Sequence, residues 1–198
     1  MDEGEWVRRI QEGETRYLTP LIERYYAGIQ KYCYYRLRSE EESKDLTQET
    51  FYRFCRHIAR YSNSGKCRAY LYTIARNLCN DHLRKRVQFP SMEFDEAVTW
   101  EAVWQGLSIE EQVEKGQLVD ELLHLLPEEQ REPVFMRFCL DLTFRDIARI
   151  TGVNVCMVQY RVKRGLNSLR SHLERSDYVE QASAVHHRNP AELPLVPR

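Results

Sequence analysis

Arginine and asparagine side chains recur at helical spacing in the segment from Cys67 to Arg86. On a helix through this segment, the polar residues would share one outward face: Thr73, Arg76, Asn77, Asn80 and Arg84. The apolar residues would face inward: Leu71, Ile74, Ala75 and Leu78. Arginine and asparagine are side chains that reach DNA phosphates and base edges. We therefore predict that the outward face binds nucleic acid.

A polar loop precedes this helix and supplies Asn63, Ser64 and Lys66. Two aromatic residues, Tyr70 and Tyr72, follow the loop closely. Aromatic rings beside a basic loop rich in Asn and Ser suit the stacking of unpaired bases. The same pattern also fits a simple connecting loop whose tyrosines lie in the core.

The signals of a helix-turn-helix lie between Thr143 and Arg164. Thr143 and Asp146 form a helix start that resembles a capping box, with Asp where Glu is usual. Gly152 can adopt the positive φ that ends a helix. Asn154 is a good N-cap for a second helix. These residues predict two helices joined by a three-residue turn.

The second of these helices divides into two faces. Its apolar face carries Val155, Val158, Val162 and Leu166. Its other face carries Met157, Tyr160, Arg161 and Arg164. In a helix-turn-helix, one stripe seats the recognition helix and the other meets the major groove. We predict that the second face contacts DNA, although an ordinary helical hairpin with a solvated charged face would show a similar pattern.

A third polar stripe occupies the segment from Glu42 to Cys55. Residues at i, i+3, i+4 and i+7 share one face of a predicted helix: Asp45, Gln48, Glu49 and Tyr52. The buried stripe of the same helix is apolar: Phe51, Phe54, Cys55 and Ile58. A polar stripe of this kind is usually a solvated helix face, and the residues alone favour that interpretation.

The six cysteines are scattered and form no CxxC motif. Four residues could in principle converge on zinc: Cys55, His57, Cys79 and His82. Their spacing lacks the paired pattern of a zinc finger, so we predict no metal site. The chain has no Gly-rich phosphate loop, HExxH motif or nucleophile elbow, and we expect neither an enzyme nor a cofactor. With no secretory signal and no stretch of about twenty apolar residues, we expect a reducing, cytoplasmic location.

Helical patterning extends over nearly the whole chain, and strand alternation is absent. We predict an all-α fold with two small helical domains, residues 1–87 and 117–175, of which the second contains the helix-turn-helix. Residues 88–116 would form an acidic, flexible linker, and residues 176–198 a disordered tail. The tyrosine-rich run 25–35 is expected in the core.

The net charge of −1 argues by itself against a nucleic-acid partner. The distribution of charge reverses that inference. Residues 56–86 carry eight Lys and Arg against one acid, and residues 155–173 carry four against none. Residues 87–116 carry seven acids against one Lys. This pattern indicates two phosphate-facing surfaces separated by a linker that avoids DNA.

Several of these segments, taken in order, resemble bacterial sigma factors. Three segments are similar to the domain that binds the promoter −10 element: Leu21-Ile-Glu-Arg-Tyr-Tyr26, Asp45-Leu-Thr-Gln-Glu-Thr-Phe51 and Arg68-Ala-Tyr-Leu-Tyr-Thr-Ile-Ala-Arg-Asn77. Leu126-Pro-Glu-Glu-Gln-Arg-Glu132, followed by the helix-turn-helix, is similar to the domain that binds the −35 element. Two domains with only a short linker resemble the extracytoplasmic-function (ECF) group, also called group IV.

The resemblance implies a role for each polar face. It implies that four residues dock on the β′ clamp helices of core RNA polymerase: Asp45, Gln48, Glu49 and Tyr52. It implies that the −10 element is bound by Asn63, Ser64, Lys66, Tyr70, Arg76, Asn77, Asn80 and Arg84. It implies that the −35 element is bound by Asn154, Met157, Tyr160, Arg161 and Arg164. The polymerase β flap and an anti-sigma factor are further implied partners.

The implied function is that of an ECF-type sigma factor, which binds core RNA polymerase, recognises the −35 and −10 elements and helps to melt DNA. Capture of unstacked bases would offset the cost of melting. The chain departs from the family pattern at Tyr70, where Trp is common, and at Gln159-Tyr160-Arg161, where Lys-Ser-Arg is frequent. The alternative is a stand-alone helix-turn-helix regulator that binds duplex DNA.

Overall fold

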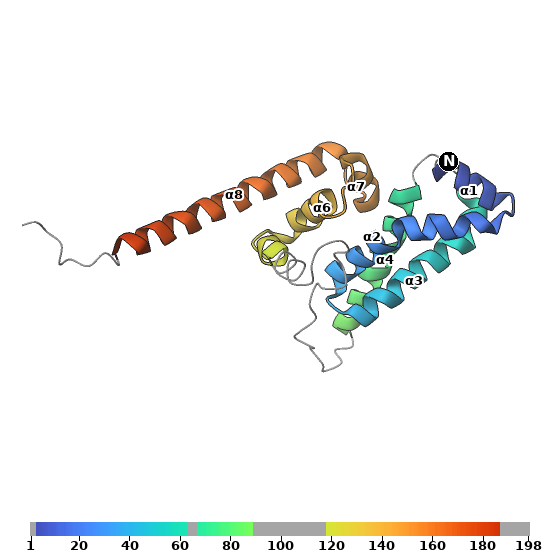
Figure 1. Cartoon of the computed structure of the whole chain (residues 1–198), viewed down its shortest axis with the longest axis horizontal. Coiled ribbons are helices and arrows are strands. Elements are labelled where there is room, and N and C mark those ends of the chain that lie inside the picture. The colour runs from blue at the N-terminus through green and yellow to red at the C-terminus, as the bar shows by residue number, and fades with distance from the viewer. Residues whose placement is uncertain (1–2, 63–66, 89–117, 187–198) are drawn as a thin grey trace, which may run out of the picture.

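The computed structural model describes residues 3–62, 67–88 and 118–186, with side chains to Arg175 in the last of these ranges (Figure 1). Within these ranges every regular element is a helix and no strand occurs, which confirms the predicted all-α fold. Gln88, the first residue of the predicted linker, is the last residue of a helix, and the rest of that linker and the loop residues Asn63, Ser64 and Lys66 lie outside the described residues.

The first bundle is built from α2, α3 and α4, which pack pairwise against one another, while α1 packs against η1, η2 and α2. Its elements are α1 (Glu3–Gln11), η1 (Thr15–Tyr17), α2 (Leu18–Leu37), α3 (Glu40–His57), η2 (Ile58–Arg60) and α4 (Cys67–Gln88). The helices α2 and α4 approach closely at Gly28, where an added Cβ would lie 2.5 Å from the Tyr72 hydroxyl. A larger residue at position 28 would therefore force these helices apart.

The sharp turn between α2 and α3 follows from local chemistry. Arg38 ends α2 in the left-handed conformation, with φ of 58°. Ser39 then caps α3, because its hydroxyl accepts a hydrogen bond from the Glu42 amide at 3.3 Å. The acidic first turn of α3 faces the positive end of the helix dipole. These signals reverse the chain and lay α3 beside α2.

The tyrosine-rich run lies in the core, as predicted. Tyr25, Tyr32, Tyr34 and Tyr35 are all buried. Tyr32 meets Tyr72 edge to face, with ring centroids 5.9 Å apart, in an arrangement favoured by aromatic quadrupoles. The rings thus join α2 to α4 and hold the first bundle together.

The second bundle contains a helix at 118–124, α6 (Glu128–Phe138), α7 (Phe144–Thr151) and α8 (Val155–His186). The Arg131 side chain donates to the carbonyls of Leu123 and Leu126, at 2.9 and 3.0 Å, and ties the first helix to α6. The helix α8 crosses α6 at Gly165, where an added Cβ would lie 2.9 Å from a Val134 methyl group. Glycine at this position permits the close crossing.

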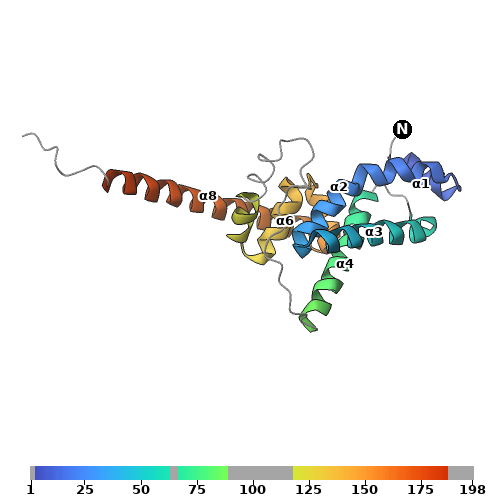
Figure 2. The same ribbon diagram turned by 60° about the horizontal axis from the view of Figure 1, so that its bottom comes forward.

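The helix α8 continues well past this crossing and projects away from both bundles (Figures 1 and 2). We predicted a disordered tail from residue 176, but residues 176–186 are helical, so the tail prediction is wrong for this segment. The segment carries no proline, and the helix started at Val155 can therefore propagate through it without losing a backbone hydrogen bond.

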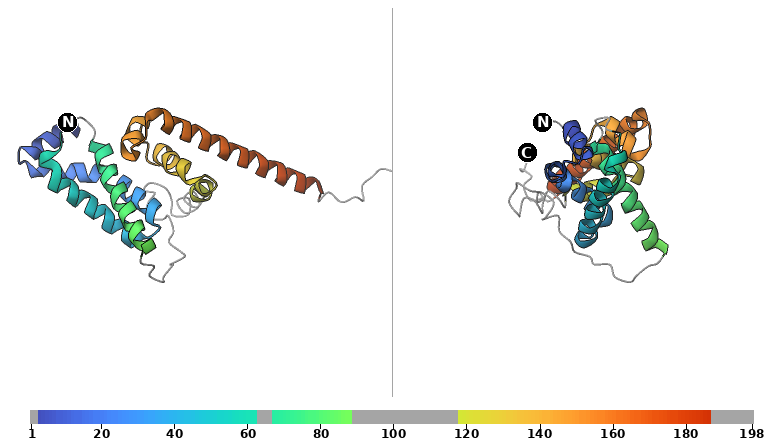
Figure 3. Two further views of the ribbon diagram at one scale, coloured as in Figure 1. Left: turned by 180° about the vertical axis from the view of Figure 1, so that it is seen from behind. Right: turned by 90° about the vertical axis from the view of Figure 1, so that its right-hand side faces the viewer.

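The two bundles lie against each other, and the main contacts join α4 to α7 (Figure 3). The Tyr35 ring of α2 stacks on the Phe135 ring of α6, with centroids 3.8 Å apart and planes 11° apart. Arg68 of α4 also donates a hydrogen bond to the Leu140 carbonyl oxygen. The second bundle therefore covers one side of the first.

Candidate nucleic-acid interface

The helix-turn-helix has the local geometry that the sequence predicts. The Thr143 hydroxyl accepts from the Asp146 amide at 3.1 Å and donates to the Asp146 carboxylate at 2.7 Å. Gly152 ends α7 with φ of 73°. Asn154 caps α8 by accepting from the Met157 amide at 2.8 Å. These caps fix the angle at which α8 leaves the turn.

The polar face of α8 is largely open to solvent. Tyr160 is 55% exposed and Met157 is 40% exposed. Arg164 is exposed and donates to the Tyr160 hydroxyl at 3.2 Å. Arg161 is less open, because its guanidinium lies 3.9 Å from the Glu129 carboxylate of α6. The structure therefore brings the four predicted residues together on one face and leaves three of them uncovered.

The apolar face of α8 differs from the prediction at Leu166. Val158 and Val162 are buried, whereas Val155 is half-buried and Leu166 is 41% exposed. Gly165 makes the crossing with α6, and the next residue on a helix is turned by about 100° from it. Leu166 consequently points away from α6, and its assignment to the buried face is wrong.

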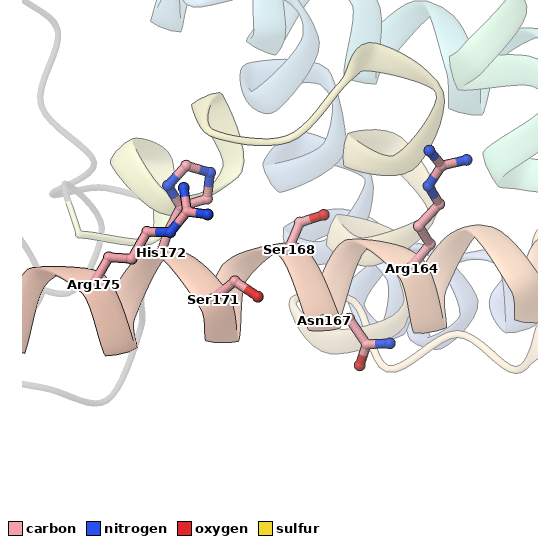
Figure 4. A pocket seen from close by; sticks show the side chains of 6 residues that line it. All are labelled: Arg164, Asn167, Ser168, Ser171, His172 and Arg175. Atoms are coloured by element: carbon pink, nitrogen blue, oxygen red, sulfur yellow. The ribbon is translucent and has the colours of Figure 1, made fainter.

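The polar face continues along α8 beyond the predicted residues. A surface hollow there is lined by Arg164, Asn167, Ser168, Ser171, His172 and Arg175. Figure 4 shows Arg164, Ser168 and His172 projecting on the same side of the helix. Their spacing of four residues keeps them in line with Met157 and Tyr160, and this spacing could have been found in the sequence.

The polar face of α4 is partly covered by the second bundle. Arg76 donates to both carboxylate oxygens of Glu132, at 3.0 and 3.2 Å. Asn80 accepts from Arg36 at 2.8 Å, and Arg36 also donates to Glu132 at 2.8 Å. Asn77 and Arg84 of the same helix are exposed. Helical spacing grouped these α4 residues correctly but missed Arg36 and Glu132, which come from other elements.

The Glu132 carboxylate sits in a largely buried and strongly cationic environment at the edge of a surface pocket. Its side chain is only 16% exposed, and the partner side chains of Arg36 and Arg76 are 18% and 24% exposed. Burial by itself raises the pKa of Glu132, but hydrogen bonding to Arg76 and the positive charge of Arg36 hold it below its ordinary value. Glu132 is therefore ionised at neutral pH and makes charge-assisted hydrogen bonds.

The aromatic residues near the polar loop divide between core and surface. Tyr72 is buried, so its ring is unavailable for stacking on a base. Tyr70 is half-buried and stacks on Tyr61, with centroids 5.0 Å apart. Of the two interpretations left open by the sequence, the core interpretation holds for Tyr72, which Gly28 and the Tyr32 ring enclose.

The polar stripe of α3 faces solvent. Asp45, Gln48 and Tyr52 are exposed, and Glu49 pairs with Arg53 of the same helix at 2.6 Å. The apolar stripe points inward, with Phe51, Phe54 and Ile58 buried and Cys55 half-buried: the predicted phase of this helix is confirmed. The face is available to a partner in the conformation described.

Among the described residues, no three or more His, Cys, Asp or Glu side chains lie close enough together to hold a metal ion. Cys33, Cys67 and Cys79 are buried, and Cys156 on α8 is exposed. Of the helices that the structure describes, none is long and apolar enough to cross a membrane.

Two protein-family models match the chain in the order of its two bundles. The model for sigma-70 region 2 matches residues 21–88, and the model for sigma-70 region 4 matches residues 116–169. The first match covers α2, α3 and α4, and the second covers the helix-turn-helix.

Known proteins of the same kind align over most of the chain. The ECF RNA polymerase sigma factor BldN of Streptomyces coelicolor is 34% identical over 172 residues, which are 83% of this chain and 64% of BldN. The chain thus spans about two thirds of the length of that relative. The ECF RNA polymerase sigma factor SigW of Bacillus subtilis is 25% identical over 181 residues, which are 84% of this chain and 94% of SigW.

Solved structures share the fold at lower identity. CnrH, solved in complex with the cytosolic domain of CnrY, superposes with a TM-score of 0.65 at 16% identity, over 87% of this chain and 97% of CnrH. The sigma factor RpoE from Bartonella quintana, solved with the anti-sigma factor NepR, superposes with a TM-score of 0.63 at 19% identity, over 79% of this chain and 96% of RpoE.

Two matched regions in the right order, together with these relatives, establish the class of the protein. The chain belongs to the sigma-70 family of RNA polymerase sigma factors. Within that family it is an ECF sigma factor, as its sequence relatives indicate.

Proposed function

We propose that this chain binds core RNA polymerase, directs it to promoters with defined −35 and −10 elements and helps to melt the DNA, as a group IV sigma factor. One observation carries the proposal most strongly. A single chain presents polar faces with DNA-binding side chains on two separate bundles, and a third polar face, on α3, remains exposed. A stand-alone regulator would need only the helix-turn-helix.

Each face takes one task in this proposal. The α3 residues Asp45, Gln48, Glu49 and Tyr52 bind the β′ clamp helices of the polymerase. The α4 residues Arg76, Asn77, Asn80 and Arg84 bind the −10 element together with the polar loop and Tyr70. The α8 residues Asn154, Met157, Tyr160, Arg161 and Arg164 bind the −35 element, and the second bundle also engages the β flap.

DNA opening in this scheme needs no covalent chemistry. Each base pair step that melts costs a few kcal/mol, and capture of unstacked bases on aromatic and polar side chains offsets that cost. We propose no cofactor and no catalytic residue. Because the polymerase is cytoplasmic, the proposed site of action is the cytoplasm.

We also propose that an anti-sigma factor controls the chain. The RpoE structure was solved with such a partner, and the fold of that protein matches this one over most of its length. The likeness in fold supports a partner of this kind.

A transcription assay with purified core polymerase tests the proposed function. The holoenzyme would first select promoter fragments from a genomic library, and transcription would then be measured with and without the chain. We expect transcripts that depend on both the chain and the selected DNA. Tight binding of the chain to duplex DNA in the absence of polymerase, with no effect on transcription, would instead establish the stand-alone regulator.

A further inference from the structure

The carboxylate of Glu132 is the point at which the two bundles meet. It accepts hydrogen bonds from Tyr32 and Arg36 of α2, both at 2.8 Å, and from Arg76 of α4 at 3.0 Å. A buried carboxylate with three donors from the opposite bundle fixes the relative position of the bundles. The Tyr35–Phe135 stack lies beside it and supplies the apolar part of the same contact.

The donors of this network include side chains of the proposed −10 surface. A guanidinium offers the same pair of N–H groups to a carboxylate and to a phosphate, so Arg76 cannot hold Glu132 and DNA at once. Asn80 is also engaged, because its side-chain oxygen accepts from Arg36. One turn earlier on the same side of α6, Glu129 lies near Arg161 of the proposed −35 surface, and Arg76, Glu129, Glu132 and Arg161 line one surface pocket. The first turns of α6 thus place two carboxylates, Glu129 and Glu132, beside arginines of both proposed DNA-binding surfaces.

The proposed polymerase face is not involved in this contact. Asp45, Gln48 and Tyr52 of α3 are exposed while Arg76 and Asn80 are covered. The helix α3 packs on α2 and α4, whereas the second bundle approaches through α6 and α7 (Figure 3). The same conformation can therefore bind a partner through α3 and still withhold Arg76 of α4 from DNA, while Asn77 and Arg84 stay exposed.

We propose that the Glu132 carboxylate binds Arg36 and Arg76 in place of a DNA phosphate. This contact holds the two bundles together in a closed form. In the closed form the chain binds polymerase through α3 and binds DNA weakly. Separation of the bundles transfers Arg36 and Arg76 from Glu132 to the DNA backbone. The proposal rests on the proposed function in one respect, which is that the polar face of α4 binds DNA.

The first experiment compares Glu132→Gln with Glu128→Gln in the full chain. Glu128 is an exposed carboxylate in the first turn of α6 that makes no hydrogen bond or ion pair to any described residue, so its removal changes the net charge equally. Small-angle X-ray scattering measures the separation of the bundles, and circular dichroism checks that both variants stay helical. Fluorescence anisotropy measures binding to a labelled duplex of mixed sequence that contains a short unpaired segment.

We expect Glu132→Gln to have a larger radius of gyration and to bind the DNA about tenfold more tightly without polymerase, because closure reduces apparent affinity by the fraction of open chain. Glu128→Gln should match the unaltered chain in both measurements. Unchanged radius and unchanged DNA affinity in Glu132→Gln would overturn the closure. A larger radius without tighter binding would retain the closure but reject the α4 face as a DNA surface, and with it that part of the proposed function.

A second variant keeps the proposal testable if Glu132→Gln prevents the second bundle from folding. Arg36→Met removes a different member of the network, on α2, and leaves Arg76 intact for DNA. It should open the chain as Glu132→Gln does, since it removes one of the two arginines that offset the cost of burying the Glu132 charge. A closed Arg36→Met chain of normal helicity would count against the proposal even if Glu132→Gln failed to fold.

Discussion

The polar faces of α4 and α8 have similar side chains but different surroundings. On α4, Arg76 is only 24% exposed and is bound to Glu132. On α8, Tyr160 is 55% exposed and Arg164 is exposed. Helical spacing therefore identifies the side chains that project from one face of a helix. It does not identify what those side chains meet.

The contrast arises from the different surroundings of two α6 carboxylates, Glu132 beside Arg76 and Glu129 beside Arg161. Glu132 points into the junction of the bundles, where exclusion of water strengthens its ion pairs. Glu129 is 58% exposed and lies at the longer distance of 3.9 Å from Arg161. An exposed pair of this kind contributes little. Glu132 of α6 therefore holds Arg76 of the α4 face, whereas Glu129 of the same helix approaches the α8 face only at Arg161.

The largest effect on stability is expected from removing the aromatic stack between the two bundles. Phe135→Ala should lower the free energy of unfolding by about 3–5 kcal/mol, because the ring is fully buried and stacks on Tyr35. Chemical denaturation measures this loss. Phe138 on the same helix is 57% exposed, so Phe138→Ala should change the free energy by less than about 0.5 kcal/mol. Equal effects of the two substitutions would show that the bundles do not meet at Phe135.

Charge reversal on α3 tests whether an exposed face in the first bundle is a binding surface. Asp45→Lys with Glu49→Lys should weaken binding to core polymerase by roughly 100-fold, since like charges placed across an interface cost several kcal/mol. Titration with labelled chain measures the affinity, and helicity should not change. Glu23→Lys on the exposed side of α2 is the control. Unchanged affinity in the double variant would mean that the stripe is only a solvated face.

Two arginines on α8 allow the comparison to be made within one helix. Arg164→Ala should weaken −35 binding by about 1–3 kcal/mol if the side chain reads a base. Arg161→Ala should have the smaller effect, because Arg161 is already near Glu129. Transcription from the selected promoter over a salt series separates a base contact, which relaxes preference at one position, from a phosphate contact, which lowers the salt dependence. Unaltered rates for both variants would show that this face does not contact DNA.

Low pH should weaken the contact of Glu132 with Arg36 and Arg76 in the unaltered chain. The pKa of Glu132 is lowered in the closed chain, so its stabilising effect is complete above the ordinary carboxyl value of 4.5 and is lost as pH falls through the lowered pKa. The scattering radius of the unaltered chain should rise in that acidic range. The radius of Glu132→Gln should not follow the same transition. A shared transition would assign the expansion to general acid unfolding.

The smallest expected effect is a difference in thiol labelling rate between α8 and the interior of the first bundle. Cys156 lies exposed on α8, whereas Cys33, Cys67 and Cys79 are buried in the first bundle. Burial raises the pKa of Cys67 to about 12, which suppresses its reactive thiolate at neutral pH. A maleimide should therefore label Cys156 first, as mass spectrometry of peptides would show. Early labelling of Cys79 would contradict the packing of α4.

Short-range sequence signals account for the local structure of the helix-turn-helix. The Thr143 and Asp146 helix start, the positive φ of Gly152 and the Asn154 cap all depend on residues within a few positions of one another. The same holds for the buried and exposed stripes of α3, which follow from helical periodicity. Such features need no knowledge of the rest of the chain.

What covers each face depends on contacts between residues that are far apart in the sequence. Arg76 and Glu132 are 56 residues apart in sequence, and nothing in their neighbourhoods pairs them. Tyr72 became core rather than a stacking platform because Gly28 lets α2 approach it, and Leu166 became exposed because α8 crosses α6 at Gly165. Each outcome depends on how two helices or two bundles dock. Docking is set by the combined shape and charge of both partners, and neither partner's sequence contains it alone.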